Sequence, residues 1–112
     1  MKCYYALYLD KNSSLKKQEI LKKLDKDEWQ LEKYLIVLSK NEKNHLEIFN
    51  SVLLLQKAID KDDLFLVGIA GGYQEALELI EQITQNVYDE TKGTDIRNYI
   101  IKKQQEYEKG SV

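Results

Sequence analysis

The sequence predicts a single domain of the α+β class. Four short segments show the alternating or continuous apolar pattern of strands, and other segments show the spacing of amphipathic helices. The chain has 112 residues, of which 43% are hydrophobic, so it is long enough to bury one core. We therefore expect strands and helices to share that core.

The N-terminal part predicts a strand followed by a helix. Residues 3–9 (CYYALYL) are rich in aromatic side chains and carry no charge on either face, so we expect both faces to be covered. Residues 10–14 are polar and offer helix caps. A lysine-rich helix follows, and its apolar stripe consists of Leu15, Ile20, Leu21 and Leu24.

The middle of the chain predicts a hairpin, a short helix and a fourth strand. Residues 29–38 alternate toward their end and residues 45–50 alternate again, with a polar turn over 39–44 between them. A short helix is expected over residues 51–59. The continuous apolar run over residues 64–70 is then expected to form the fourth strand.

Two helices are predicted at the C-terminal end. The longer one covers residues 73–90, and Gly93 suits its C-terminal exit. Its apolar positions with helical spacing are Tyr73, Ala76, Leu77, Ile80, Ile83 and Val87. Thr94 or Asp95 can cap the last helix, which bears Ile96, Tyr99, Ile100 and Tyr107.

The predicted order is β-α-β-β-α-β followed by two helices, which is the order of a ferredoxin-like sandwich with an antiparallel sheet. The two added helices would cover the second face of the sheet. We expect the domain to span residues 1–105 and the polar tail over residues 106–112 to fray. This likeness concerns the fold alone, because such folds host many unrelated functions.

The ferredoxin-like strand order 4-1-3-2 places the strand over residues 64–70 at an edge of the sheet. Edge strands normally carry charge, proline or a bulge that discourages pairing with another chain. This segment carries neither charge nor proline, although Gly68 is a candidate bulge. We therefore expect a homodimer that uses this edge or the C-terminal helices.

Composition argues against several classes of partner. The net charge is −2, from 17 basic and 19 acidic residues, and Arg97 is the only arginine, which disfavours nucleic acid and acidic membranes. The single cysteine cannot form an internal disulfide. With no signal-peptide pattern and no apolar run of membrane-spanning length, a cytoplasmic location is predicted.

The glycine turn before residues 73–90 is interpreted as structural. Gly68, Gly71 and Gly72 do not match a dinucleotide-binding or P-loop motif. Glu75 lies in the first turn of the predicted helix, where its carboxylate complements the helix dipole and would repel a phosphate. We expect a tight strand-to-helix turn here and no bound phosphate.

No catalytic constellation or cofactor site is predicted. Cys3 and His45 are the strongest nucleophile and base, but an antiparallel arrangement of their strands would hold them apart. Cys3 is expected to be a buried, inert thiol and His45 to lie near the hairpin turn. Two clusters of acidic residues lack the ligands or the spacing of a metal site. The first consists of Asp60, Asp62 and Asp63, and the second of Glu75, Glu78 and Glu81.

Tyrosine is the unusual feature of the composition, with eight tyrosines and two phenylalanines. Tyr4 and Tyr8 share a face of the first strand, where some RNA-binding sheets expose stacking aromatics. Tyrosine also fills cores and protein interfaces. A core or interface role is the first interpretation, ligand stacking the second, and RNA binding the third.

These observations predict a small non-enzymatic binding module, whose partner is another protein or a second copy of the chain. The alternative is a small-molecule sensor or enzyme with a cleft at one end of the sheet, suited to a neutral or aromatic ligand. The residues expected to surround that cleft are Tyr4, Trp29, Asn50, Ser51, Gly71, Gly72 and Tyr73.

Overall fold

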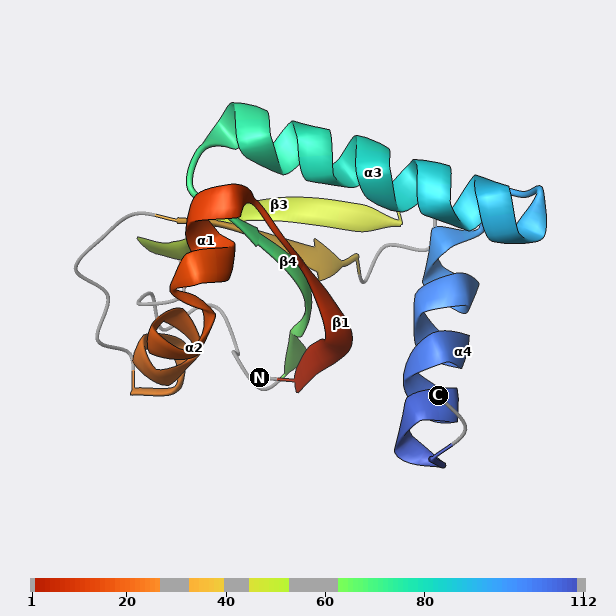
Figure 1. The fold of residues 1–112 in the computed structure, drawn as a ribbon, viewed down its shortest axis with the longest axis horizontal. Helices are drawn as coiled ribbons and strands as arrows, with labels where there is room; N and C mark the ends of the chain where they lie inside the picture. Colours follow the sequence, from red (N-terminus) through yellow and green to blue (C-terminus); the bar gives the residue numbers. More distant parts are fainter. Residues whose placement is uncertain (1, 27–32, 40–44, 53–62, 111–112) are drawn as a thin grey trace.

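The computed structural model describes residues 2–26, 33–39, 45–52 and 63–110. Its elements are β1 (Lys2–Leu9), α1 (Lys11–Leu15), α2 (Lys17–Lys26), β2 (Tyr34–Leu38), β3 (Leu46–Asn50), β4 (Phe65–Ala70), α3 (Tyr73–Thr91) and α4 (Ile96–Glu108) (Figure 1). The predicted α+β class is confirmed. One four-stranded mixed sheet carries helices on both of its faces.

The strand order is β1-β4-β2-β3, which differs from the ferredoxin-like prediction. β4 pairs in parallel with β1 and antiparallel with β2, and β2 pairs antiparallel with β3. The predicted order and the fully antiparallel sheet are therefore wrong. β4 lies inside the sheet, because a strand that is apolar on both faces is stabilised most where strands flank it and helices cover it.

The edge argument for a dimer through β4 is wrong for the same reason. Leu66, Val67 and Ile69 of β4 are completely buried. The lack of charge and proline in this strand reflects its central position in the sheet. The outer strands of the sheet are β1 and β3.

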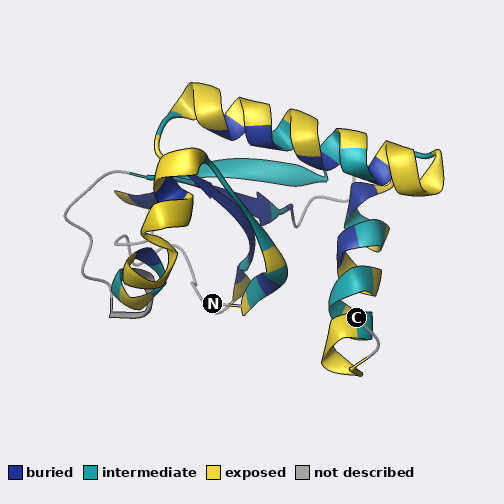
Figure 2. Ribbon diagram, in the orientation of Figure 1, coloured by how far each residue is buried: buried dark blue, intermediate teal, exposed yellow. Residues whose placement is uncertain are grey.

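Two clusters of buried side chains lie on opposite faces of the sheet. Figure 2 shows the buried parts of the strands and helices in dark blue. On one face α3 and α4 pack over residues that include Tyr4, Ile36 and Val67. On the other face Ile20 of α2 packs with Leu35 and other residues of the sheet. The expectation that both faces of the first strand are covered, one of them by the C-terminal helices, is confirmed.

The N-terminal helical segment departs from its predicted form. It consists of two helices with a break at Lys16, and Asp10 caps the first of them by accepting the Ser13 N–H at 2.8 Å. Ser13 is completely buried, whereas Leu15 is 80% exposed. The prediction that Leu15 belongs to the apolar stripe is wrong, because the break changes which side of the segment faces the sheet.

The C-terminal helices lie where they are predicted. α3 ends one residue beyond its predicted end, and its left-handed C-cap is Lys92 instead of Gly93. Asp95 caps α4 by accepting the Asn98 N–H. α4 continues to Glu108, which lies within the tail expected to fray.

Two predicted elements lie partly outside the described residues. Ser51 and Val52 form a short 3₁₀ turn, and the rest of the helix expected over residues 51–59 is not described. β2 begins at Tyr34, so the described strand is shorter than the predicted segment 29–38. Trp29 also falls outside the described part of the chain.

The prediction of a sheet irregularity at Gly68 is confirmed. β1 advances five residues between Cys3 and Tyr8, while β4 advances only two between Leu66 and Gly68. The register between β4 and β2 shifts beside the same glycine. A Cβ atom on Gly68 would lie 3.1 Å from the Tyr8 carbonyl oxygen and 3.2 Å from Ile36 Cδ1.

The substitution Gly68→Ala is expected to lower the free energy of unfolding by about 1 kcal/mol, because the added methyl group is crowded on both sides of the strand. Gly93→Ala is the control, since a Cβ atom there meets only Thr91 Oγ1 at 3.6 Å. Urea denaturation measures both variants. A Gly68→Ala protein as stable as the control would contradict this account of the site.

Candidate functional site

The residues predicted to surround a cleft are only partly brought together. Tyr34 of β2 pairs with both Asn50 of β3 and Ala70 of β4, so Asn50, Ser51, Gly71, Gly72 and Tyr73 lie toward one end of the sheet. Tyr4 lies toward the other end, because β1 is parallel to β4 and its Cys3 pairs with Leu66. Trp29 is outside the described residues.

At that end of the sheet the polar groups serve the local backbone. The Ser51 hydroxyl accepts the Lys33 N–H at 2.9 Å, and the Ser51 N–H donates to the Lys33 carbonyl at 2.7 Å. Asn50 Oδ1 accepts the Val52 N–H at 3.0 Å. The Tyr73 ring packs edge-on against the Tyr34 ring, with centroids 5.8 Å apart. These contacts hold together the open end of the β2–β3 hairpin, opposite its turn.

Two carboxylates occupy the glycine turn before α3. Asp10 Oδ2 accepts the Gly71 N–H at 2.8 Å, while its other oxygen caps α1. The Glu75 carboxylate lies so close to Gly72 that a Cβ atom there would collide with it. Negative groups thus stand where a phosphate would need hydrogen-bond donors and positive charge.

Cys3 and His45 lie at the two opposite edges of the sheet. Cys3, expected to be buried, is half-buried on β1, and His45 directly precedes β3, so β4 and β2 separate them. Three strand spacings amount to roughly 14 Å, which is far beyond hydrogen-bond reach. The two residues are apart as expected, but the predicted reason is wrong. β1 and β3 run in the same direction, and Cys3 and His45 lie toward the same end of the sheet, so the strand order alone separates them.

The N-terminal tyrosines form an internal aromatic cluster. Tyr4 is only 4% exposed, and its ring stacks on Tyr8 with centroids 6.4 Å apart and meets Tyr5 edge-on at 5.0 Å. The Tyr8 hydroxyl accepts Asn86 Nδ2–H of α3 at 2.8 Å. Tyr4 and Tyr8 therefore join β1 to the helical layer, and the Tyr4 ring is closed to a stacking ligand.

α4 contacts the outer edge of β1. The Tyr5 N–H donates to Gln104 Oε1 at 2.8 Å. The rings of Tyr5 and Tyr107 stack with centroids 4.6 Å apart. A helix that bonds an edge strand in this way hinders pairing with another chain.

β3 is the other outer strand, and in the described part of the chain it pairs with β2 alone. The Ser39 N–H donates to the His45 carbonyl, and the Ser51 N–H donates to the Lys33 carbonyl. In an antiparallel pair alternate residues bond to the neighbouring strand. The backbone groups of Leu46 and Ile48 consequently point away from β2.

The side chains of β3 offer little protection for that edge. All five of its residues are half-buried (Figure 2), and the strand contains one charged residue, Glu47. Its carboxylate accepts the Ser39 hydroxyl at 2.5 Å. Leu46 and Ile48 pack against the α3 side of the core, whereas Phe49 lies on the other face. Apolar groups thus lie on both faces of the β3 edge.

A stripe of half-exposed side chains on α3, which we call the α3 stripe, faces the same side as β3. Its members recur every three or four residues and are Tyr73, Leu77, Ile80, Thr84 and Tyr88. Tyr73 contacts β2, while Asn86 on another face of α3 contacts β1, so the α3 stripe lies toward the β3 side. Three of its members also line an open groove of about 500 Å³.

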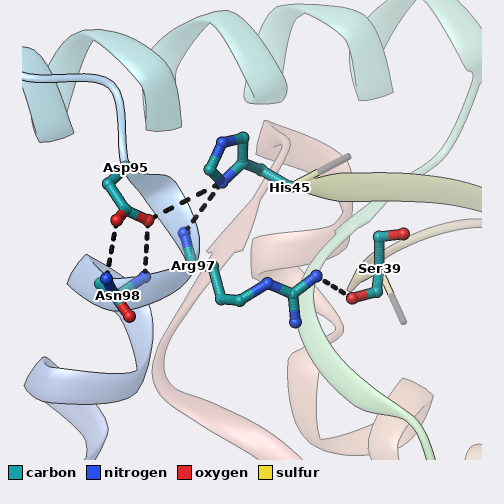
Figure 3. Close-up of polar contacts among 5 residues, drawn as sticks. All are labelled: Ser39, His45, Asp95, Arg97 and Asn98. Carbon is teal, nitrogen blue, oxygen red and sulfur yellow. Dashed lines mark hydrogen bonds and ion pairs between the residues drawn. The ribbon is translucent and has the colours of Figure 1, made fainter. Parts of the chain in front are cut away.

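A polar cluster fixes the start of β3 to α4 (Figure 3). His45 Nδ1 accepts the Arg97 backbone N–H at 3.3 Å and lies 4.0 Å from Asp95 Oδ1. The Arg97 guanidinium donates to the Ser39 carbonyl at the end of β2. The only arginine of the chain thus holds the β2–β3 hairpin in place, a role that its rarity does not reveal.

Comparisons of the chain with protein-family models, curated proteins and solved structures find no match. Among the described residues, no group of three or more His, Cys, Asp and Glu side chains is placed to hold a metal ion. No described helix has the length and apolar character needed to cross a membrane. The surface formed by the β3 edge and the α3 stripe is the candidate functional site.

Proposed function

We propose that the protein is a non-enzymatic binding module, whose partner protein adds a strand to the outer edge of β3. The observation that carries this proposal is the outward direction of the Leu46 and Ile48 backbone groups, on a strand that pairs only with β2 in the described residues. Strand addition uses such groups for affinity and alternate side chains for specificity. A cytoplasmic setting, expected from the sequence, is part of the proposal.

The surroundings of β3 favour an extended apolar segment as the binding element. An added strand would lie about 4.8 Å from β3 and would present alternate side chains to the two faces of the sheet. On one face those side chains would approach the α3 stripe, where Tyr73 is 55% and Tyr88 49% exposed. On the other face they would meet Phe49, so apolar residues are favoured on both sides.

The alternative function, binding of a small molecule, would use a different site from the β3 edge. An open groove of about 540 Å³ lies between the end of α3 and α4. Glu90 in that groove accepts the Tyr99 hydroxyl and lies 3.7 Å from Lys103 Nζ, so these polar groups engage one another. The groove begins beside the start of β3, because its lining residue Asp95 lies 4.0 Å from His45. Its other end is lined by Lys102 and Glu106 of α4, so a binding map can separate the two functions by these residues.

Peptide selection followed by NMR mapping tests the proposed function. Peptides selected from a random seven-residue library on the immobilised protein are expected to have alternating apolar residues. Titration of a selected peptide should shift the amide signals of Leu46 and Ile48 first. Shifts confined to Glu90, Asn98 and Lys102 would favour the groove and contradict strand addition.

Two variants separate backbone hydrogen bonding at β3 from nonspecific binding to exposed apolar side chains. Ile48→Pro removes an outward N–H, and proline is tolerated at such an edge position, so the variant should fold and lose peptide binding by at least tenfold. Ile101→Lys alters a partly exposed apolar residue on α4 and should keep full binding. Equal binding by both variants would contradict the proposal.

A further inference from the structure

We infer that the strand added to β3 is β3 of a second copy of this chain, paired antiparallel about a two-fold axis at Ile48. This inference rests on the proposed function, since it names the partner of the same edge. A two-fold interface brings the same surface of each copy together, so β3 must complement itself. The dimer therefore requires a register in which the side chains of β3 complement those of its own copy.

A two-fold axis at any residue of β3 places the outward backbone groups of the two strands opposite one another, and the three central positions, residues 47, 48 and 49, pair the most residues of the strand. An axis at Glu47 sets the two carboxylates directly opposite, with Cα atoms about 4.5 Å apart, which is destabilising. An axis at Phe49 pairs only part of the strand. An axis at Ile48 pairs the whole of Leu46–Asn50 with itself.

The register centred on Ile48 also suits the side chains. Glu47 lies opposite Phe49 of the second copy, so no like charges face each other across the axis. Ile48 lies opposite its own copy on the face that packs against the α3 side of the core. Both copies keep their α3 stripe on that same face, so the two stripes would flank the joint. Both the separation of like charges and the contact between apolar side chains therefore favour the register centred on Ile48.

The other edge of the sheet explains why the assembly would stop at two copies. The outer side of β1 is engaged by α4 through the bond between the Tyr5 N–H and Gln104. Because α4 contacts β1 at Tyr5 and no described segment pairs with the outer side of β3, each copy offers the β3 edge for pairing. Two copies then form one continuous sheet whose outer strands are the two copies of β1. Because the β3 edge is used up in each copy, the assembly stops at a dimer and does not grow into a fibre.

Cross-linking of single cysteines tests the register. In a Cys3→Ala background, Glu47→Cys, Ile48→Cys and Phe49→Cys are each oxidised under identical conditions. Opposite residues of a hydrogen-bonded antiparallel pair lie about 5.5 Å apart at Cα, within the range of a disulfide. The Ile48→Cys protein should form disulfide-linked dimers at least tenfold faster than the other two. Fastest cross-linking at residue 47 or 49 would overturn the inferred register.

Sedimentation of the unmodified chain at micromolar concentrations tests the dimer itself. Ile48→Lys places two like charges opposite each other and should raise the dimer dissociation constant at least 100-fold, while Ile101→Lys should leave it unchanged. A monomer at all concentrations overturns the inference. If that monomer still binds selected peptides at β3, the proposed function survives. If it does not, both the inference and the proposed function fail.

Discussion

The substitution Tyr4→Ala is expected to lower the free energy of unfolding by about 3–5 kcal/mol, which is the usual cost of truncating a buried aromatic residue. Tyr4 is 4% exposed and contacts the rings of Tyr5, Tyr8 and Phe65. Removal of its ring leaves a cavity between β1 and the helical layer. Urea denaturation measures the loss. Tyr88→Ala is the control and should cost less than about 1 kcal/mol, because Tyr88 is 49% exposed.

The hydroxyl of Tyr4 makes the fold sensitive to alkali. Burial raises the pKa of Tyr4 well above its ordinary value of 10.0, and the neighbouring Tyr5 and Tyr8 raise the pKa further. A pKa raised in the folded state gives stability that is complete below pH 10 and is lost as the pH rises above it. Each pH unit above 10 is expected to remove up to about 1.4 kcal/mol.

Tyr4→Phe should remove that part of the alkaline loss while keeping the packed ring. Unfolding free energies of the two proteins between pH 8 and about pH 12 measure the effect. The variant is expected to lose less stability than the parent protein across the alkaline part of this range. Parallel curves for the two proteins would show that the Tyr4 hydroxyl is not desolvated as the structure places it.

Asp10→Ala is expected to lower the free energy of unfolding by about 2 kcal/mol, because the side chain makes two separate bonds. It caps α1 at Ser13, which is typically worth about 1 kcal/mol. Its second oxygen accepts the Gly71 N–H before α3, and a bond to a charged group adds a similar amount at a partly exposed site. Asp10→Asn should lose less, since the amide oxygen can still act as the cap.

The same carboxylate predicts a loss of stability in acid. Burial raises the pKa of Asp10, but hydrogen bonds from Ser13 and Gly71 and the charge of Lys33 outweigh it, so the pKa lies below its ordinary value of 3.8. This contribution to stability is present above pH 3.8 and is lost as the pH falls through the folded pKa. Asp10→Asn should flatten that part of the acid unfolding curve, and an unchanged acid curve would contradict the assignment.

Local features of the chain were predictable because local interactions determine them. The long amphipathic spacing places α3 within one residue of its expected bounds, and the capping aspartate places the start of α4, whereas α4 continues three residues into the tail expected to fray. The alternating segments form β2 and β3 as a hairpin, which needs only a short turn. Residues 50, 51 and 71–73 gather at one end of the sheet, since β3 and β4 flank β2 and both end there.

The strand order was not predictable from local pattern, because β1 and β4 pair across about 60 residues of sequence. The apolar run of β4 fits an interior strand as well as a badly protected edge, and the ferredoxin-like template favoured the edge. That template also placed Tyr4 in the cleft and left β3 in the interior. The break at Lys16, which exposes Leu15, likewise depends on contacts between α1 and the sheet.

Amide hydrogen exchange at β3 tests the central claim most directly. In protein dilute enough to be monomeric, the Leu46 and Ile48 amides should exchange at nearly the rates of an unstructured peptide, because they point away from β2. The Glu47 and Phe49 amides, which point toward β2, should exchange at least 100-fold more slowly. Equal and strong protection of all four amides in the monomer would show that the chain covers its own β3 edge, and would contradict the proposed binding surface.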